Sequence, residues 1–357
     1  MRDNDARGEQ DGRSANTMNP LHAVEIVGGG LAGLSLGLAL RREGVPVTLF
    51  EAGGYPRHRV CGEFISGLGD GTVARLGLRE FLTGARPHNS VTYHLRGRPL
   101  RPFSLPATAW GISRHALDAR LAAAFVEAGG ELRSNTRVPE EATPPGRVFA
   151  AGRKRKGTHW VGLKVHADNL PLVNDFEIHL GNRAYVGLSR IETGAVNVCG
   201  IFARREITAK GADLLGAYLE AAGLGALAER LRAAEPDPAS FCVTAASLGD
   251  RRVAPADRIW IGDACATIPP FTGNGLAMAL QGAELAVAPL LAYCSGRAGW
   301  GESIRATGAA QRRRFNRRLM LASLLHPLFL EPRRQRWLAA ILSTRLVPFR
   351  AVYAALR

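Results

Sequence analysis

Residues 23–33 read Ala-Val-Glu-Ile-Val-Gly-Gly-Gly-Leu-Ala-Gly, and this stretch decides the fold. The β-branched run at its start predicts a buried strand, which continues directly into a G-x-G-x-x-G pattern. The apolar segment Leu34–Arg42, followed by Gly44, predicts a helix with a glycine at its C-terminus. A second strand is expected over Val45–Phe50, with Glu51 at its end. Strand, glycine loop, helix and strand together predict a Rossmann-like α/β unit.

Each position of the glycine pattern has a physical task in binding a dinucleotide. Gly28 permits a tight turn, Gly30 lets the backbone approach a pyrophosphate, and Gly33 lets the helix and the strand pack closely. The first N–H groups of the helix have no partner within it and face the phosphates, so Leu31 and Ala32 belong to the expected binding set. This stretch therefore predicts a dinucleotide site.

Glu51 completes the pattern, because it lies 18 residues after Gly33 at the end of the second strand. A carboxylate at that position can accept hydrogen bonds from a ribose diol. The alternative, a flexible glycine turn, does not account for the surrounding strands and helix. The motif leaves open whether the dinucleotide is FAD or NAD.

A second motif, far along the chain, bears on that choice. A short strand is expected over residues 258–261 and a helix from Leu276 to about Leu291, with Gly262-Asp263 between them. The carboxylate of Asp263 can accept a hydrogen bond from a ribityl hydroxyl. The amides that open the helix can stabilise negative charge on a flavin ring. An ordinary strand-turn-helix is the alternative. The residues expected on the flavin side are Pro270, Gly273, Asn274 and Gly275.

Together these motifs resemble those of the FAD-dependent oxidoreductases that include aromatic hydroxylases, flavin halogenases and geranylgeranyl reductases. Residues 56–64, Pro-Arg-His-Arg-Val-Cys-Gly-Glu-Phe, are similar to the Pro-x-x-x-x-Cys-Gly segment of the geranylgeranyl reductase branch. Residues 112–118, Ile-Ser-Arg-His-Ala-Leu-Asp, are similar to the element whose arginine commonly touches the cofactor. Arg59 and Arg114 lie in these two elements and are expected at the cofactor.

The resemblance covers residues 22–291. It implies a fold like that of p-hydroxybenzoate hydroxylase, FAD bound in an extended conformation, and a substrate sheet over the flavin ring. Two departures from the family pattern bear on the chemistry. Ala151 stands where hydroxylases usually have the acid of a second Asp-Gly pair, which weakens the case for a typical NAD(P)H-controlled hydroxylase. The Trp-x-Trp-x-Ile-Pro signature of tryptophan halogenases is absent from the sequence, so halogenation is the third choice.

Ser113 predicts the N-cap of a helix whose apolar residues Leu117, Leu121 and Phe125 share one face. Arg114 then falls in the first turn, where the helix dipole disfavours a cation, and this mismatch supports a ligand role for it. A solvated surface arginine is the alternative.

Cys61 and Glu63 are the candidate catalytic residues. A lone cysteine is more often a small buried hydrophobic residue. In this segment His58 and Arg59 would favour the thiolate, which suits a residue near the flavin and the substrate. The sequence favours this position and the buried structural role equally. Glu63 is expected to act as a proton donor or as an ion-pair partner of Arg59. His115, His166 and His179 show no metal-ligand spacing, so they are interpreted as structural or surface residues and no metal site is expected.

Strand signals over residues 90–103 and 160–202 predict an antiparallel sheet inserted between the halves of the dinucleotide domain. Such a sheet can form the wall of a pocket above a flavin. The expected organisation is a disordered leader (1–20), an FAD-binding domain (21–90, 104–159 and 240–295), a substrate-binding sheet domain (91–103 and 160–239) and a basic helical region (296–357).

The charge of the chain is concentrated in this last region. The whole chain carries 46 Lys+Arg against 31 Asp+Glu. Residues 297–357 hold 13 Arg and only two acids, Glu302 and Glu331, which gives +11. Arginine clusters alternating with apolar stretches suit helices that lie on an anionic lipid surface or that present arginine to a phosphate or an acyl carrier. A helical lid with a solvated arginine face is equally consistent. Nucleic acid is disfavoured, because the rest of the chain is near neutral.

These observations favour a cytoplasmic FAD-dependent oxidoreductase, with peripheral contact to the inner face of the membrane left open. Five widely spaced cysteines without a signal peptide favour reduced thiols. The expected reaction is geranylgeranyl-reductase-type C=C reduction of a prenyl or polyketide-like molecule, with NAD(P)H or another donor reducing the flavin. Monooxygenation of a hydrophobic or aromatic substrate is the first alternative. An FAD-binding membrane-surface protein without enzyme activity is the non-enzyme alternative.

Overall fold

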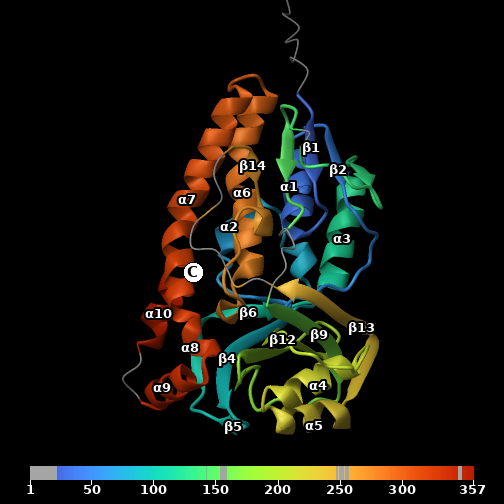
Figure 1. The fold of residues 1–357 in the computed structure, drawn as a ribbon. Helices are drawn as coiled ribbons and strands as arrows, with labels where there is room; N and C mark the ends of the chain where they lie inside the picture. Colours follow the sequence, from blue (N-terminus) through green and yellow to red (C-terminus); the bar gives the residue numbers. More distant parts are fainter. Residues whose placement is uncertain are drawn as a thin grey trace, which may run out of the picture.

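The computed structural model describes residues 22–141, 143–152, 159–246, 248, 253, 257–344 and 348–357. The expected leader lies outside these residues. Figure 1 shows a parallel sheet with its helices at one end of the molecule, a larger sheet at the other end, and a long helix, α7, along one side.

The first motif forms the centre of a five-stranded parallel sheet, as the sequence predicts. Val24, Ile26 and Leu49 are fully buried, because helices cover this sheet and its strands are apolar on both faces. The strand order is β14 (Ile259–Trp260), β8 (Arg147–Phe149), β1 (Val24–Val27), β2 (Val47–Phe50) and β7 (Glu131–Arg133). The main helices of this domain are α1 (Leu31–Arg42), α3 (Arg114–Glu127) and α6 (Gly275–Cys294). Helix α1 packs against both α3 and α6.

Two glycines of the first motif are required by close approach. Gly28 has φ +113°, and a Cβ there would lie 2.4 Å from the carbonyl carbon of Ala150 on the neighbouring strand end. A Cβ on Gly33 would lie 2.0 Å from the carbonyl oxygen of Gly28. Both contacts are far shorter than a carbon atom allows, so strand β1, its loop and helix α1 can pack only with glycine at these positions.

The second sheet has nine strands and is predominantly antiparallel. Its order is β13 (Glu235–Ala246), β9 (Trp160–Asp168), β12 (Val196–Ala203), β11 (Ala184–Arg190), β10 (Phe176–Gly181), β4 (Arg86–Leu95), β6 (Phe103–Gly111) and β3 (Phe64–Ile65), with β5 (Arg98–Pro99) paired to β4. The predicted turns at Gly181-Asn182 and at residues 192–194 connect β10 to β11 and β11 to β12. One pair, β4 with β10, is parallel, since these strands come from two separate passes of the chain into the sheet. The sheet also takes in more of the chain than residues 91–103 and 160–239.

The two faces of this sheet have different partners. Helices α4 (Asp213–Ala221) and α5 (Gly225–Ala233) cover one face over a core that includes Leu163, Val165 and Val198. The opposite face packs partly on the C-terminal helices and partly on the segment after β2. Because side chains alternate along a strand, Lys164 and His166 point away from the α4–α5 face. Alternate residues of β9 therefore face the α4–α5 core on one side and the segment after β2 on the other.

The remaining helices complete the molecule. They are α2 (Asp70–Arg75), α7 (Trp300–Leu325), α8 (Pro327–Leu330), α9 (Pro332–Ser343) and α10 (Phe349–Ala355), with 3₁₀ turns at Glu80–Leu82, Gly262–Ala264 and Pro270–Thr272. Helix α6 is long and apolar enough to cross a membrane by length and composition, but half of its apolar window is buried inside the protein. It packs between α1 and α7, which is the position of a core helix.

Candidate functional site

The structure brings the two distant glycine motifs together at one edge of the parallel sheet. Gly262, in the turn after β14, has φ +61°, and a Cβ there would lie 3.0 Å from the Cβ of Ala32 in the first turn of α1. The carboxyl ends of β1 and β14 meet at this edge, with β8 between them. In parallel sheets, ligands bind outside the carboxyl ends of the strands, where the strand order reverses. The arrangement therefore fits the predicted cofactor site.

The N-terminus of α1 is open toward this edge. Its N-cap, Gly30, provides no side chain to cap the helix, and the first turn contains no acid. A Cβ on Gly30 would meet only the Arg114 guanidinium, at 3.7 Å. Free N–H groups, a positive helix end and a facing arginine suit a pyrophosphate. The space at the N-terminus of α1 stays open because Gly30 has no side chain, and a pyrophosphate requires such a space.

Glu51 lies where the ribose partner is expected, buried at the end of β2. Its carboxylate accepts hydrogen bonds from the N–H groups of Gly29 (2.9 Å) and Gly53 (3.0 Å). It also pairs with Arg57 at 3.0 Å and with Arg59 at 3.5 Å. In this structure Glu51 therefore also organises the glycine loop and two arginines. Its predicted role toward a ribose remains a prediction.

Arg59 and Arg114 converge on a single carboxylate, that of Asp118. Arg114 donates two hydrogen bonds to Asp118, at 2.7 and 2.6 Å, and Arg59 donates one at 3.2 Å. The predicted N-cap of this helix is confirmed, since the Ser113 hydroxyl accepts from the N–H of Ala116 at 3.0 Å. Asp118, one turn into α3, stabilises the arginine that the helix dipole disfavours. Arg114 is therefore held over Gly30 and is not a solvated surface residue.

The loop before α6 is also fixed by side chains from elsewhere. Asn274 is fully buried, donates from Nδ2 to the carbonyl of Ser66 (2.6 Å) and accepts at Oδ1 from Arg318 (2.8 Å). Arg318 is 3% exposed, and burial lowers its pKa to about 10. Neither α1 nor α6 has a side-chain cap, so both helix N-termini offer N–H groups at the same edge. Gly273 in turn packs on Phe64.

A buried ionic cluster centred on Glu63 joins the two domains. Glu63 is 0% exposed and adopts a left-handed backbone conformation with φ 50°, which is uncommon for a residue with a side chain and is concentrated at functional sites. Its carboxylate accepts from the backbone N–H of Arg114 (2.9 Å) and bonds to His166 Nε2 (2.6 Å). Lys164 Nζ lies 3.5 Å from the same carboxylate. Burial would raise the pKa of Glu63, but His166, Lys164 and the Arg114 N–H together lower it below 4.5.

This geometry corrects one expectation for Glu63. Its ion-pair partners are Lys164 and His166, whereas Arg59 pairs with Glu51 and Asp118. The reason is that Lys164 and His166 of β9 reach Glu63, whereas Glu51 and Asp118 of the first domain hold Arg59. A carboxylate held ionised by three donors is also a poor proton donor. Its expected role as a proton donor is therefore disfavoured.

Lys164 is fully buried and touches a second histidine. Its Nζ lies 3.2 Å from His58 Nδ1, and the His58 ring stacks on His115 at 4.4 Å between centroids. Burial, followed by the charge of Lys164, lowers the pKa of His58 to about 4. His58 is therefore neutral at pH 7 and accepts the hydrogen bond from the lysine.

Cys61 differs from the expectation of a thiolate. Burial raises the pKa of its thiol, and the positive charge of Arg114 only partly offsets this. The sulfur accepts a hydrogen bond from the N–H of Glu63 at 3.3 Å. The sequence neighbours His58 and Arg59 are occupied by other partners, so they do not activate the thiol. At neutral pH Cys61 keeps its proton.

Several site residues were not identified from the sequence. Lys164, His166, Ser189 and Asn197 all project from the sheet toward the segment 61–63. Ser189 Oγ donates to the carbonyl of Gly62 at 3.0 Å, and Asn197 Nδ2 donates to that of Cys61 at 3.0 Å. The available signal was the alternation of polar and apolar residues along β9, which predicts a polar face. The Asn197 Oδ1 atom is buried without a hydrogen-bond partner among the described residues.

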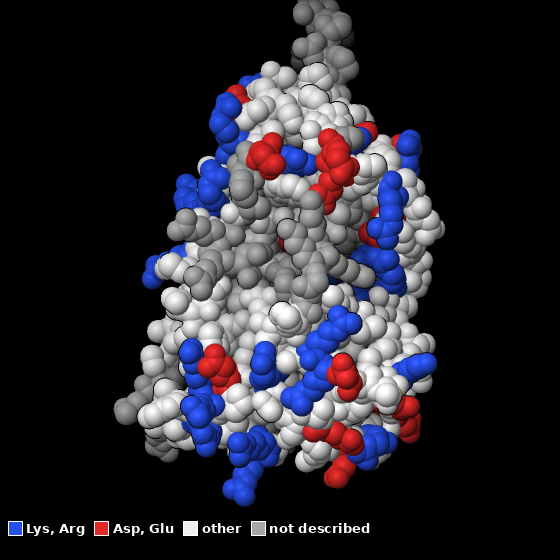
Figure 2. All heavy atoms as spheres, in the orientation of Figure 1, with Lys and Arg blue, Asp and Glu red and all other residues white. Residues whose placement is uncertain are grey.

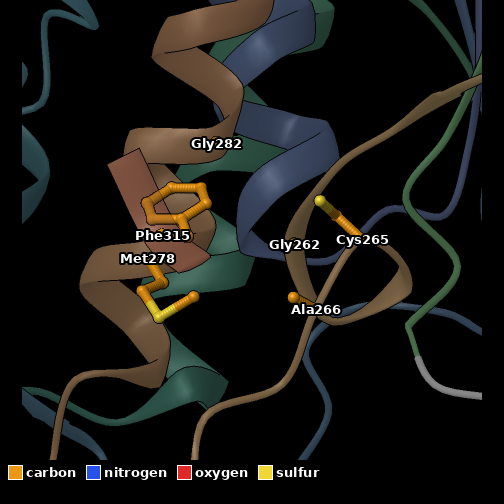
Figure 3. Close-up of a pocket in the computed structure, with 6 residues that line it drawn as sticks. All are labelled: Gly262, Cys265, Ala266, Met278, Gly282 and Phe315. Atoms are coloured by element: carbon orange, nitrogen blue, oxygen red, sulfur yellow. The ribbon is translucent and has the colours of Figure 1, made fainter. Parts of the chain in front are cut away.

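A small cavity lies behind the Gly262 turn, between α6 and α7 (Figure 3). Met278 and Phe315 point toward it from the two helices, and Cys265 and Ala266 close the opposite side. Its volume is about 10 Å³, which is at the limit for a single water molecule. This space is a packing gap of the second motif and is too small for a substrate.

A second cluster, His94, Glu177 and His179, lies on the other face of the sheet, under α5. Their ligand atoms lie within 4.8 Å of one another, a separation that could hold a metal ion. The cross-strand register between β4 and β10 brings the two histidines together, which the sequence spacing did not reveal. Arg230 already lies 3.2 Å from the Glu177 carboxylate and supplies the positive charge that this buried group needs. The expectation of no metal site remains a prediction.

Comparisons with known proteins agree with this geometry. The model of the NAD(P)-binding Rossmann-like domain family matches residues 26–92. A menaquinone reductase of Mycolicibacterium smegmatis is 27% identical over 125 residues, which is 34% of this chain and 31% of that protein. This sequence match therefore spans about a third of the relative.

Solved structures match over nearly the whole chain. HpxO of Klebsiella pneumoniae, in complex with FAD and uric acid, superposes with a TM-score of 0.74 at 16% identity, covering 96% of this chain and 97% of that one. PqsL of Pseudomonas aeruginosa, described as a probable FAD-dependent monooxygenase, gives a TM-score of 0.66 at 16% identity, covering 91% and 100%. The chain therefore has the fold predicted from its motifs, a Rossmann-like domain with an inserted sheet and C-terminal helices.

The Glu63 cluster generates a stability prediction. Replacing Glu63→Gln leaves Lys164 buried without a negative partner, and we expect the free energy of unfolding to fall by about 3–5 kcal/mol. The double variant Glu63→Gln/Lys164→Met should recover most of that loss, because it removes the uncompensated charge as well. Urea unfolding at pH 7 measures both. As a control, Glu80→Gln removes a glutamate that is 67% exposed and paired with Arg42, and should change stability by less than about 1 kcal/mol.

The same cluster predicts the sign of the pH dependence. The folded-state pKa of Glu63 lies below its ordinary value of 4.5, so its contribution to stability is complete above pH 4.5 and is lost as the pH falls toward the folded pKa. Unfolding free energies of wild type and Glu63→Gln should therefore converge on acidification. A difference that stays constant down to pH 3 would contradict the ionised assignment.

Proposed function

We propose that this chain, which has the fold of the FAD-dependent oxidoreductases related to p-hydroxybenzoate hydroxylase, binds FAD and is itself an oxidoreductase. The proposed substrate is a hydrophobic small molecule of prenyl or polyketide-like character, and the proposed reaction is reduction of a C=C bond. The observation that carries the proposal is the position of the turn at residues 61–63. This turn lies between the glycine-loop edge of the parallel sheet and the polar face of the second sheet.

The residues of this edge fit FAD. The open N-terminus of α1 with Arg114 opposite it would hold the pyrophosphate, and Glu51 at the end of β2 would face the adenosine ribose. Asp263 is exposed in the turn that packs on α1, where a ribityl chain would pass. Gly273, at the N-terminus of α6, would lie at the flavin ring. Residues 61–66 contact both Arg114 and Asn274, and so lie between the proposed pyrophosphate and flavin ends of this edge.

A hydrophobic substrate is supported by an aromatic cluster next to the second motif. Phe271, two residues before Gly273, stacks on Phe329 at 4.0 Å, and its N–H donates to the Tyr185 hydroxyl at 3.2 Å. The sheet face beside it carries further buried apolar residues, Tyr93, Phe103, Ile178 and Leu180. The proposed flavin ring would therefore lie beside an apolar region of the protein, which suits a prenyl or aromatic substrate.

Reduction of a C=C bond takes a hydride, which FAD supplies when it is bound and has been reduced by NAD(P)H or another donor, and a proton, which the chain must supply. Cys61 is the group proposed to hold that proton, because its raised pKa keeps the thiol protonated at neutral pH. Glu63 is proposed as a positioning residue, since its left-handed backbone and three donors set the direction of the turn. Asn197 and Ser189 fix the two carbonyls of that turn.

Three observations bear on the choice of reaction. Similarity to a menaquinone reductase and the protonated Cys61 support reduction. The structural likeness to a probable FAD-dependent monooxygenase supports oxygen transfer as the second candidate. Both reactions would occur at the same edge of the sheet. A cytoplasmic location is proposed from the five free cysteines, three of them partly accessible, which suit a reducing compartment.

FAD binding is tested by substitution of Gly30. In Gly30→Glu the backbone, at φ −83°, accepts a side chain and only Arg114 lies within 4 Å, so the fold should persist. The new carboxylate would occupy the pyrophosphate position, and we expect FAD affinity to fall at least about a hundredfold. Quenching of flavin fluorescence on titration measures this. Gly225→Glu, at the open start of α5 in the other domain, is the matched control and should bind FAD as wild type does. Equal affinity in both variants would remove the assignment.

The reaction is tested with reduced, FAD-loaded protein under anaerobic conditions. Addition of a geranylgeranyl lipid should reoxidise the flavin, followed by absorbance at 450 nm, and mass spectrometry should show a product heavier by two hydrogen atoms. A flavin that reoxidises productively only with oxygen, with a product that gains one oxygen atom, would establish the monooxygenase instead. Tightly bound flavin with turnover of neither kind would favour the non-enzyme alternative.

A further inference from the structure

The C-terminal helices expose an unusual number of large apolar side chains. In the described part of the chain eight large hydrophobic residues are exposed, and five of them lie between residues 320 and 352. They are Met320 (53%), Leu324 (67%), Trp337 (72%), Ile341 (52%) and Val352 (38%). Single exposed apolar residues are ordinary on protein surfaces, whereas such a concentration marks an interaction surface.

These side chains are arranged in pairs one helical turn apart. Met320 and Leu324 are at i and i+4 on α7, and Trp337 and Ile341 are at i and i+4 on α9. On α9 a different set, including Leu338 and Leu342, faces the core of the protein. The helix therefore has one apolar surface that the fold buries and a second that it leaves exposed.

Arginines surround the exposed apolar residues. Between residues 312 and 350, the exposed arginines of the described part of the chain are Arg312, Arg313, Arg314, Arg317, Arg333, Arg334, Arg336 and Arg350. Only two acids are present in residues 297–357, and one of them, Glu331, pairs with Arg334 at 2.7 Å. Figure 2 shows Lys and Arg side chains along the flank that α7 forms in Figure 1, with few acids beside them. The surface is thus both apolar and strongly positive.

Two arginines of the same region are used differently. Arg318 binds Asn274 and Gln281 inside the protein, and Arg357 donates to Ser66 at 2.6 Å. Within the described part of the chain, the exposed arginines named above, apart from Arg334, form no ion pair with the rest of the fold. The region therefore combines inward arginines that hold the loop before α6 with outward arginines that face the solvent.

We propose that the outer surface of α7, α9 and α10 is a docking surface for an anionic lipid bilayer, on which the protein lies without crossing it. Tryptophan and aliphatic side chains enter the headgroup boundary, and the arginines around them bind lipid phosphates. A bilayer matches both features of this surface, because Trp337, 72% exposed beside Ile341, suits the headgroup boundary and the arginines suit the lipid phosphates. A second copy of the chain is the competing occupant that the variants below test.

Helices α8 and α9 lie between the proposed docking surface and the aromatic cluster. The inner faces of α8 and α9, through Phe329, Leu330 and Leu338, close over the sheet face that carries the aromatic cluster. A molecule dissolved in the bilayer would lie one helix layer away from that cluster. This consequence rests on the proposed function, whereas lipid binding itself does not.

Vesicle co-sedimentation of the full chain tests the proposal. The anionic vesicles contain phosphatidylcholine and about 30% phosphatidylglycerol, which gives them a negative surface charge. The protein should sediment with them, and its Trp fluorescence should shift to the blue. Pure phosphatidylcholine vesicles should bind it at least about tenfold more weakly, and 0.5 M salt should release most of it. Absence of binding to the anionic vesicles, or equal binding to both, overturns the proposal.

Two pairs of variants assign the surface. Trp337→Ser/Ile341→Ser should lose the blue shift and most of the binding, whereas Val126→Ser/Val243→Ser, two exposed residues elsewhere, should not. Arg333→Gln/Arg336→Gln should weaken binding by roughly tenfold or more, whereas Arg79→Gln/Arg98→Gln, two arginines that are also exposed, should have little effect. All four should bind FAD as wild type does, so failure here is distinguishable from failure of the proposed function. If wild type is a dimer that Trp337→Ser/Ile341→Ser converts to a monomer, the surface joins two copies and the proposal is wrong.

Discussion

The burial of the Glu63 carboxylate is the constraint on which the arrangement of the site depends. An ionised carboxylate with no exposed surface requires partners, and they come from three places: the N-terminus of α3, the imidazole of His166 and the ammonium of Lys164. Since α3 belongs to the dinucleotide domain and β9 to the second sheet, one side chain fixes the distance between the two domains. The turn at residues 61–63 can be displaced only by exposing or unpairing this charge.

Other contacts connect the Glu63 cluster to the glycine loop on one side and to the second motif on the other. Toward the glycine loop, Arg114 is held over Gly30 by Asp118. Toward the second motif, Ser66 binds Asn274, which in turn is held by Arg318 of α7. The two cofactor motifs therefore share one rigid support, although more than 200 residues separate them in the sequence. In the proposed function, this support would hold the Cys61 thiol and the open N-termini of α1 and α6 around the flavin.

The sequence allowed the parallel sheet, both glycine motifs and the cap at Ser113 to be predicted, because each depends on neighbouring residues and on the backbone freedom of glycine. The Glu63 cluster could not be predicted in the same way. Its pairing with Lys164 joins positions 101 residues apart and depends on how two sheets pack. The expectation of a thiolate at Cys61 is not supported for a related reason. His58 and Arg59 are near Cys61 in the sequence, but His58 contacts Lys164 and Arg59 contacts Asp118, so neither activates the sulfur. The sequence therefore shows which residues lie near Cys61 along the chain, but it does not show which of them act on the pKa of its thiol.

The central claim is that the flavin ring lies beside the turn at residues 61–63, and substitution of Cys61 tests it most directly. In Cys61→Ser we expect unchanged FAD affinity, together with a shift in the visible absorption bands or the reduction potential of the bound flavin and a fall in turnover. Cys294→Ser, a buried cysteine at the far end of α6, is the control and should leave all of these unchanged. A Cys61→Ser protein whose flavin spectrum, potential and turnover all equal those of wild type would contradict the account.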